Sequence, residues 1–353
     1  MKFRLLIFTK LLANIIFAQT DTISKLTFST YGELYYSYDF SNPTNNEKSN
    51  FLYNHKRHNE INANLLLVKA NYLNKKYRAN LGLMAGNYAQ YNLNSEPTWA
   101  QFIYEANIGI KLSDKKNIWL DAGILPSHIG FESAISADCW TLTRSLLAEN
   151  SPYYETGLKL SYTSPNEKLF LSVLVLNGWQ RIRKPDFIQR PSFGVQATYK
   201  PTLNLTFNYS NFIGTDKPDS LNSIRHFHNF YLQFEPSKKF GIIAGFDIGF
   251  ENILNNKYCN WYSPVIILRQ RTSKKTMVAL RAEYYSDLKE IIIATGTANG
   301  FQTLGLSSNL DYEISNKIKF RIEGKLYHSK DKIFSSNTSN NNFSLTTNLT
   351  LKL

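Results

Sequence analysis

The chain has 353 residues, of which 43% are hydrophobic, 14% aromatic and 19% charged, and its formal net charge is +13. This composition excludes an intrinsically disordered chain, and the two cysteines exclude a disulfide framework or a cysteine-rich zinc site. A mean hydropathy of −0.32, with no run of about 18 apolar residues, excludes a bundle of membrane-spanning helices.

The first residues are typical of a secretory signal. Lys2 and Arg4 precede a mostly apolar stretch, and Ala18 is a small residue after which a signal peptidase could cut. We therefore expect residues 1–18 to be a cleaved signal peptide and residues 19–353 to form one domain. A buried first helix is the alternative.

Apolar and polar residues alternate with a period of two along the rest of the chain. Residues 318–327 place Ile, Phe, Ile, Gly and Leu between Lys, Arg, Glu, Lys and Tyr, and residues 102–112, 203–212, 240–251 and 343–353 alternate in the same way. A helical period of 3.6 would not sort the residues like this, so each segment is predicted to be a strand with one apolar and one polar face.

Sixteen such segments can be counted, and fourteen is the alternative because the segments near Glu60 and Leu169 are less regular. The predicted strands start near Thr27, Arg57, Tyr77, Phe102, Asn117, Tyr154, Leu169, Ser192, Leu203, His228, Phe240, Cys259, Thr276, Phe301, Ile318 and Phe343.

The connections between these strands are alternately long and short. The long ones are 40–56, 91–101, 126–153, 179–191, 213–227, 252–258, 287–300 and 328–342, and the short ones are 74–76, 113–116, 164–168, 200–202, 236–239, 272–275 and 313–317. Outer-membrane barrels have short turns on one side and long loops on the other, and strands can cross hydrocarbon only as a closed sheet. The sequence therefore predicts an all-β fold, a transmembrane antiparallel up-and-down β-barrel of about 16 strands.

The positive charge does not by itself indicate a nucleic-acid partner. Much of it comes from lysines in the short turns, such as Lys75, Lys76, Lys238 and Lys239. Charges at turns are typical of a solvated rim, so we expect no nucleic-acid binding. Tyrosines near strand ends are instead predicted to form interfacial girdles. These are Tyr36, Tyr38, Tyr72, Tyr77, Tyr104, Tyr162, Tyr199, Tyr209 and Tyr312.

Four segments carry a resemblance to a known family. Residues 119–132 (WLDAGILPSHIGFE), 140–145 (WTLTRS), 148–155 (AENSPYYE) and 176–180 (LNGWQ) together resemble the OmpL-like β-barrel porin family of Bacteroidota outer membranes. The similarity is densest over residues 96–183. The resemblance implies an outer-membrane pore, although the chain ends in Leu353 where outer-membrane barrels usually end in an aromatic residue.

The expected function is that of a porin, a passive diffusion channel for small polar solutes. The alternative is a barrel that is no channel, an adhesin or structural protein whose lumen is plugged by its own loops. The loop 126–153 mixes charged and apolar residues, so we expect it to fold into the lumen and constrict it, with Arg144 facing Glu132, Glu105 or Asp121. An extracellular lid is the alternative for this loop.

The predicted lining of the pore consists of inward-facing charged residues and of charged residues in this loop. The candidate lining or constriction residues are Glu105, Lys111, Asp121, His128, Glu132, Arg144, Glu149, Arg321 and Glu323, with Glu33, Arg281, Glu283, Lys319 and Lys325 as further inward-facing residues. Cys139 and Cys259 both fall toward the loop side, so they are candidates for a disulfide. Two free thiols are the alternative.

No catalytic motif is present, so we expect no enzyme, no metal and no cofactor. His226 and His228 share one face of a strand, but no acidic cluster lies at ligand spacing beside them. The expected partners are outer-membrane lipid and lipopolysaccharide, the barrel assembly machinery and small polar solutes. A homo-oligomer is possible at this strand number.

Overall fold

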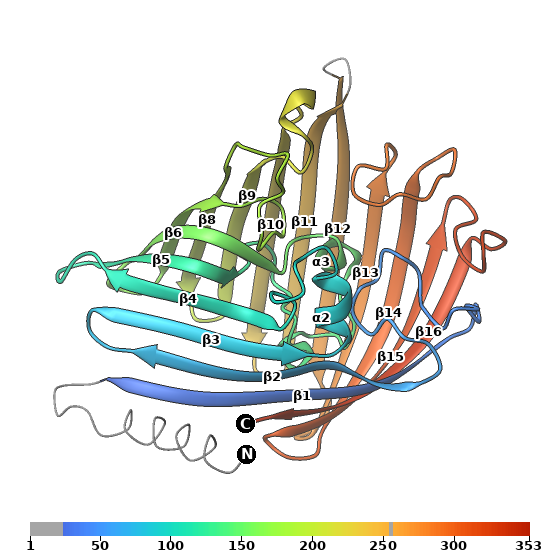
Figure 1. Cartoon of the computed structure of the whole chain (residues 1–353). Helices are drawn as coiled ribbons and strands as arrows, with labels where there is room; N and C mark the ends of the chain where they lie inside the picture. The colour runs from blue at the N-terminus through green and yellow to red at the C-terminus, as the bar shows by residue number, and fades with distance from the viewer. Residues whose placement is uncertain (1–23, 254–256) are drawn as a thin grey trace, which may run out of the picture.

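The computed structural model describes residues 24–253 and 257–353, which form one closed β-barrel of sixteen antiparallel strands (Figure 1). Each strand pairs with its neighbours in sequence, and β1 closes the ring by pairing with β16. The strands are β1 (Lys25–Asp39), β2 (Ile61–Leu73), β3 (Tyr77–Ala85), β4 (Ile103–Lys111), β5 (Asn117–Pro126), β6 (Tyr154–Thr163), β7 (Leu169–Leu176), β8 (Ser192–Thr202), β9 (Leu205–Gly214), β10 (Arg225–Ser237), β11 (Phe240–Ile253), β12 (Lys257–Arg271), β13 (Thr276–Asp287), β14 (Phe301–Glu313), β15 (Ile318–Ser329) and β16 (Asn341–Lys352). The predicted barrel of sixteen strands is confirmed, whereas the predicted signal peptide, residues 1–18, lies outside the described residues.

The period of two in the sequence separates the two faces of the barrel wall. On β15, Phe320 and Leu326 are exposed on the outer face, whereas Arg321, Glu323 and Lys325 are buried on the inner face. The same alternation holds along β11, β14 and β16. An apolar outer belt around polar inner residues is the arrangement that a barrel needs in a bilayer.

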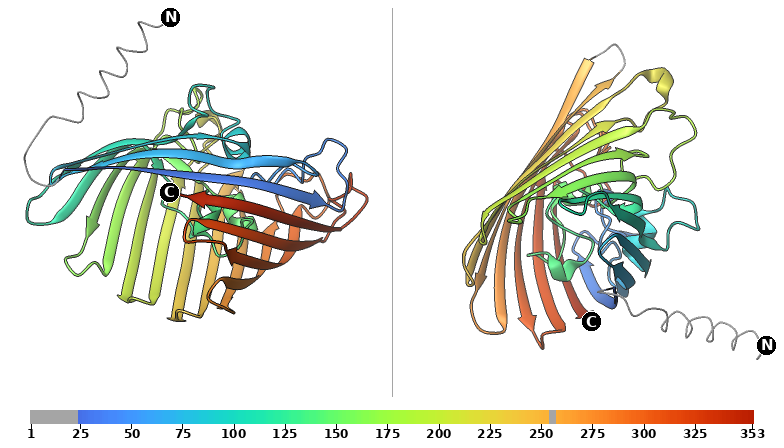
Figure 2. Two further views of the ribbon diagram at one scale, coloured as in Figure 1. Left: turned by 90° about the horizontal axis from the view of Figure 1, so that it is seen from below. Right: turned by 90° about the vertical axis from the view of Figure 1, so that its left-hand side faces the viewer.

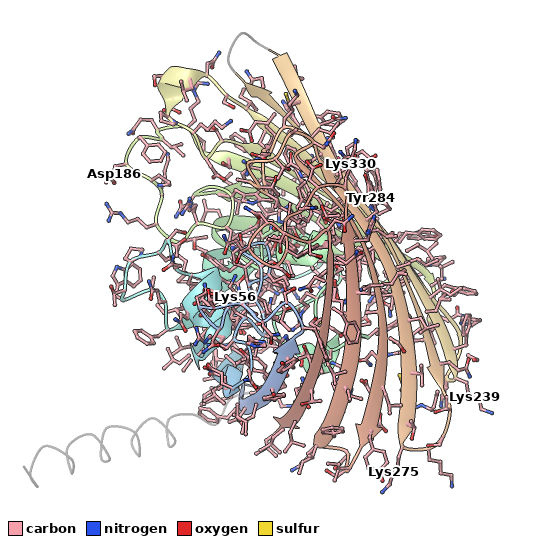
Figure 3. All side chains as sticks on the ribbon, turned by 90° about the vertical axis from the view of Figure 1, so that its right-hand side faces the viewer. Lys56, Asp186, Lys239, Lys275, Tyr284 and Lys330 are labelled. Atoms are coloured by element: carbon pink, nitrogen blue, oxygen red, sulfur yellow. The ribbon has the colours of Figure 1, made fainter. Side chains whose placement is uncertain are left out.

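Short turns gather at one end of the barrel, which we call the turn end, and most long connections at the other, the loop end. Figure 3 shows Lys239 and Lys275 at the turn end, and Asp186 and Lys330 toward the loop end. Two sequence predictions were wrong in detail. The sixth outer connection is shorter than predicted, because β11 continues to Ile253 and β12 begins at Lys257. The second strand, β2, begins at Ile61 instead of near Arg57.

One predicted girdle residue lies inside the barrel. The pairing of β3 with β4 shifts register between Gly82 and Leu83 and passes over Tyr104. A bulge adds one residue to a strand and so changes the face that its side chains occupy. The ring of Tyr104 consequently lies 6.5 Å from that of Tyr88 inside the barrel, and the Nζ of Lys69 lies over it at 5.7 Å.

The interior is filled in part by the chain's own loops. Two short helices, α2 (Asn87–Asn92) and α3 (Leu146–Glu149), lie within the ring of strands, where α2 contacts β2 and β3 and α3 contacts β12 and β13 (Figures 1 and 2). The 3-10 turn η1 (Ser136–Asp138) belongs to the same loop as α3, and η2 (Asp219–Leu221) lies in the connection from β9 to β10. No helix in the described part of the chain is long and apolar enough to cross a membrane.

Candidate functional site

The connection from β5 to β6, residues 127–153, which we call L3, turns into the barrel instead of covering its mouth. His128 fixes its first residues, because Nδ1 lies 2.7 Å from Glu155 Oε2 and Nε2 lies 2.7 Å from the carbonyl oxygen of Asn211 on β9. Burial lowers the pKa of His128, but Glu155 and these hydrogen bonds outweigh it and raise the pKa above its usual value. His128 thus pins the start of L3 to the wall through both ring nitrogens.

The deepest part of L3 is η1. Ser136 Oγ donates a hydrogen bond to Glu33 Oε1 on β1 at 2.7 Å, and Arg321 Nη1 on β15 donates to the carbonyl oxygen of Ser136 at 2.7 Å. Asp138 Oδ1 accepts a bond from Lys352 Nζ at 2.5 Å. Lys352 ends β16 at the turn end, so L3 reaches through most of the barrel's depth.

L3 returns along β13 and β15 through a cluster of buried charges. Arg281 Nη2 lies 2.8 Å from Glu323 Oε1, while Glu323 Oε2 accepts from the backbone N–H of Thr143 at 2.6 Å. Arg281 Nη1 donates to the carbonyl oxygen of Thr143 at 2.8 Å, and Lys325 Nζ donates to that of Arg144 at 2.8 Å. Charges buried in this way need partners, and the backbone of L3 supplies several of them.

Arg144 does not face carboxylates across an opening, so this part of the prediction was wrong. Its guanidinium is fully buried and donates to three carbonyl oxygens of its own loop, those of Ser133 (2.6 Å), Ala134 (2.9 Å) and Leu142 (2.8 Å). Arg144 therefore holds the two arms of L3 together, and residues from the wall supply the charges that L3 meets.

The two predicted acidic residues of L3 also act within the loops. Glu132 Oε2 accepts hydrogen bonds from the N–H and the hydroxyl of Ser145, and Glu132 Oε1 lies 3.8 Å from Arg281 Nη1. Burial raises the pKa of Glu132, against the opposing effects of Arg281 and Ser145. Glu149 Oε2 accepts from the backbone N–H of Tyr53 at 2.8 Å and of Asn54 at 3.2 Å, so it joins L3 to the first loop.

That first loop, residues 40–60 or L1, also enters the lumen, which the sequence analysis did not predict. His55 Nε2 lies 2.7 Å from Glu33 Oε1, and both side chains are fully buried. The His55 N–H donates to Asn64 Oδ1 at 2.9 Å, and Phe51 and Leu52 join an apolar cluster inside the barrel. The signal in the sequence was His55 close to the pair Phe51 and Leu52 within a mostly polar loop.

The side of the barrel formed by β1 to β7 keeps a cavity of about 570 Å³ near the turn end, which we call the vestibule. Glu105 and Asp121, both predicted to line the pore, lie on the wall of the vestibule. Each pairs with a wall cation instead of Arg144, since Glu105 Oε1 lies 2.6 Å from Lys69 Nζ and Asp121 Oδ1 lies 2.6 Å from Arg78 Nε. Lys111 is the last residue of β4 and lies half-buried at the turn end.

A second cavity of about 390 Å³ opens toward the loop end, between α2, L3 and the connection after β7. It shares no lining residue with the vestibule. Apolar side chains that include Leu67, Met84 and Ile124 form one cluster, and on their strands they lie farther from the turn end than Lys69, Arg78 and Asp121 do. This apolar cluster therefore lies on the loop-end side of these three vestibule residues.

The cysteines do not form the candidate disulfide. Cys139 and Cys259 are both free and buried. Cys139 lies in the deep part of L3, where its Sγ donates to the carbonyl oxygens of Ser133 and Ile135, while Cys259 lies on β12 near the loop end. Sequence order could not reveal this difference in depth. Among residues 24–253 and 257–353, no group of three His, Cys, Asp or Glu side chains could hold a metal ion.

A family model described as "Putative beta-barrel porin-2, OmpL-like" matches residues 25–353. The chain belongs to this porin family. It is an outer-membrane β-barrel, and the resemblance found in the sequence is confirmed. No curated protein matches the chain.

Solved porin structures share the fold at low identity. The anion-selective porin from Comamonas acidovorans has a TM-score of 0.61 at 9% identity, over 94% of this chain and 100% of that one. The outer-membrane channel DcaP of Acinetobacter baumannii has a TM-score of 0.61 at 9% identity, over 95% and 99%. The trimer form of Vibrio cholerae OmpT has a TM-score of 0.58 at 8% identity, over 94% and 100%.

Proposed function

We propose that this porin passes small polar solutes by passive diffusion along its β1 to β7 side, and that L3 sets the narrowest part of the route. The observation that carries the proposal is the unequal filling of the lumen. L3 is held against β13 to β16 by buried charges, whereas the opposite side keeps a polar vestibule of about 570 Å³. A sixteen-stranded barrel is wide enough for an aqueous channel unless its own loops occupy it.

The predicted constriction includes parts that the sequence analysis did not assign. L1 contributes His55, which is tied to Glu33, and α2 contributes Tyr88 to the apolar cluster of the β1 to β7 side. A solute would therefore pass L3, L1 and α2 between the loop-end cavity and the vestibule. Constrictions of this kind sort solutes by size and charge.

The structure also gives weight to the second candidate, an adhesin or structural barrel with a plugged lumen. The two cavities have no lining residue in common, and the apolar cluster lies on the loop-end side of Lys69, Arg78 and Asp121 in the vestibule wall. If this cluster and L3 never move apart, the protein conducts no solute.

Single-channel conductance in a planar lipid bilayer tests the proposal. We expect discrete steps from the wild-type protein, and steps about twofold larger or more after deletion of residues 133–147, because conductance follows the open cross-section. The Asp186→Ala variant in the fourth outer loop is the matched control and should conduct like the wild type. Absence of steps from both the wild type and the deletion variant would contradict the proposal and favour the structural barrel.

The partners follow from the same proposal. The outer belt of the barrel would contact membrane lipid and lipopolysaccharide, and the barrel assembly machinery would insert it. We also propose that the chain forms homo-oligomers. Chemical crosslinking in native outer membranes would show oligomers if it does and monomers alone if it does not.

A further inference from the structure

We propose that the vestibule is a binding site for small oxyanions, so that solutes carrying phosphate or carboxylate groups are preferred. This inference deepens the proposed function by naming a solute class at the same lumen. Its first ground is the charge of the vestibule wall, where four cations, Lys25, Lys69, Arg78 and Lys159, face two carboxylates, Glu105 and Asp121.

The two carboxylates are already paired within the wall. Lys69 Nζ lies 2.6 Å from Glu105 Oε1, and Arg78 donates to both oxygens of Asp121, at 2.6 Å and 2.5 Å. Gly109 makes room for this bidentate pair of Arg78 and Asp121, because a Cβ at position 109 would lie 2.3 Å from Asp121 Oδ1. The two pairs leave Lys25 and Lys159 as the excess positive charge.

Of the four cations of the vestibule, Lys159 is the one best placed to bind a ligand. It is half-buried on β6 beside Asp121, its partner in the strand register, yet Arg78 occupies both carboxylate oxygens of Asp121. Within the described ranges, Lys159 Nζ has no hydrogen-bond acceptor and no carboxylate within 4.0 Å. A partly desolvated ammonium group without an acceptor is stabilised by an anion.

Fixed amides complete the wall of the vestibule. Asn71 Nδ2 donates to Asn80 Oδ1 at 2.6 Å, Asn80 Nδ2 to Asn107 Oδ1 at 2.7 Å, and Asn107 Nδ2 to the carbonyl oxygen of Ile124 at 2.9 Å. Each amide group has two N–H donors, so this chain orients the side chains and leaves donors for a bound oxygen. Trp119 holds the Arg78 guanidinium, whose carbon lies 4.4 Å from the ring centroid.

The wall of the loop-end cavity carries no excess of cations, because Arg181 and Arg225 are matched in number by Glu149 and Asp216. Arg225 is paired with Asp216 at 2.9 Å and with Glu251 at 2.7 Å, and Arg181 Nη1 donates to Ser95 Oγ at 2.7 Å. Glu149 also lines this cavity and accepts backbone N–H groups. An anion preference would therefore arise on the turn side of the constriction.

Titration of the purified, detergent-solubilised full chain with inorganic phosphate by isothermal calorimetry tests this inference without requiring ion flow. We expect saturable binding by the wild type and about fivefold weaker binding by Lys159→Gln, because one charge-assisted contact is lost. Lys159→Arg should retain binding. Lys239→Gln, which removes an exposed lysine at the same end of the barrel, is the matched control and should bind like the wild type.

Two results would overturn the inference: no saturable binding of phosphate by the wild type, or binding by Lys159→Gln that equals that of the wild type. A reversal potential in a KCl gradient separates this inference from the proposed function. Conductance without phosphate binding would refute the oxyanion site alone, whereas phosphate binding without conductance would refute the channel alone. In a conducting barrel, Lys159→Glu should shift the reversal potential toward cation preference.

Discussion

The inward-facing charges on the two sides of the lumen find their partners in different ways. On the β13 to β16 side, the inward charges Arg281, Arg321 and Lys325 bind the backbone of L3 and are buried. On the β1 to β7 side, Lys69 and Arg78 bind carboxylates of the neighbouring wall, and water can enter beside them. Inward charges therefore face an open cavity only where no loop covers them.

The largest expected effect comes from removing the central cation of the filled side. Arg281→Ala would leave Glu323, Glu283 and Glu132 without their shared partner, and loss of one member of such a buried cluster costs about 3–5 kcal/mol. We expect L3 to undock while the strands persist. Single-channel recordings should show bursts of higher conductance, and protease should cut within residues 133–147.

Arg281→Lys is the matched variant for this cluster. It keeps the charge but loses the fork of donors, so its bursts should be rarer than those of Arg281→Ala. If both variants conduct as steadily as the wild type, the buried cluster does not hold L3 in place.

The next largest effect distinguishes the β1 to β7 side, which keeps the vestibule, from the side that L3 fills. Met84→Ala should lower the free energy of unfolding by about 2–3 kcal/mol and raise conductance, because it opens the apolar cluster of the β1 to β7 side. Ile243→Ala removes a similar apolar group from behind L3, next to Trp140 and Leu147. It should destabilise the barrel without raising conductance, and equal conductance of both variants would argue against a route along β1 to β7.

A smaller effect is expected from pH, with opposite signs for the two loops. Burial lowers the pKa of His55 below its ordinary value of 6.5, against the effect of Glu33, so docking of L1 weakens as pH falls below about 6.5. The pKa of His128 is raised, so its contribution to docking of L3 is complete below pH 6.5 and is lost as pH rises through the raised pKa.

Current fluctuations recorded from pH 5 to pH 9 should increase toward acid pH as L1 undocks and toward alkaline pH as L3 undocks, and should be smallest between these two ranges. His55→Gln should reduce the increase at acid pH, and His128→Gln the increase at alkaline pH. If each variant instead reduces the increase at the opposite end of the pH range, the assignment of the two histidines is reversed.

The smallest effect is expected at the outer rim. Arg183 Nη2 lies 2.9 Å from Asp186 Oδ2, but both side chains are largely exposed, at 59% and 84%. Exposed pairs contribute little to stability, so Asp186→Ala should change neither conductance nor thermal stability measurably. A measurable change in either would mean that the Arg183–Asp186 pair itself stabilises the constriction.

The sequence predicted the wall well because a period of two depends only on neighbouring residues. It failed at Tyr104. A register shift opposite Gly82 and Leu83 turns the side chain of Tyr104 to the inner face, although the alternation of apolar and polar residues in the sequence continues through this position. It also placed inward charges such as Arg321 and Glu323 correctly, since each follows from the alternation of β15.

The partners of those charges could not be predicted in the same way. Glu33 binds His55, Ser136 and Asn348, which come from L1, L3 and β16, and only closure of the ring brings β1 beside β16. Arg144 was expected to face carboxylates because charge attracts charge. The carbonyl oxygens that bind it become available only when L3 folds back on itself.

Thiol labelling of the lumen tests the central claim most directly. On a background with Cys139→Ser and Cys259→Ser, a cysteine would replace either Asn80 in the vestibule or Ser307, which is 8% exposed on the inner face of β14. A small, membrane-impermeant charged thiol reagent should label the Asn80→Cys protein rapidly and the Ser307→Cys protein only after deletion of residues 133–147. Equally rapid labelling of both in the intact barrel would contradict the unequal filling of the lumen by L3.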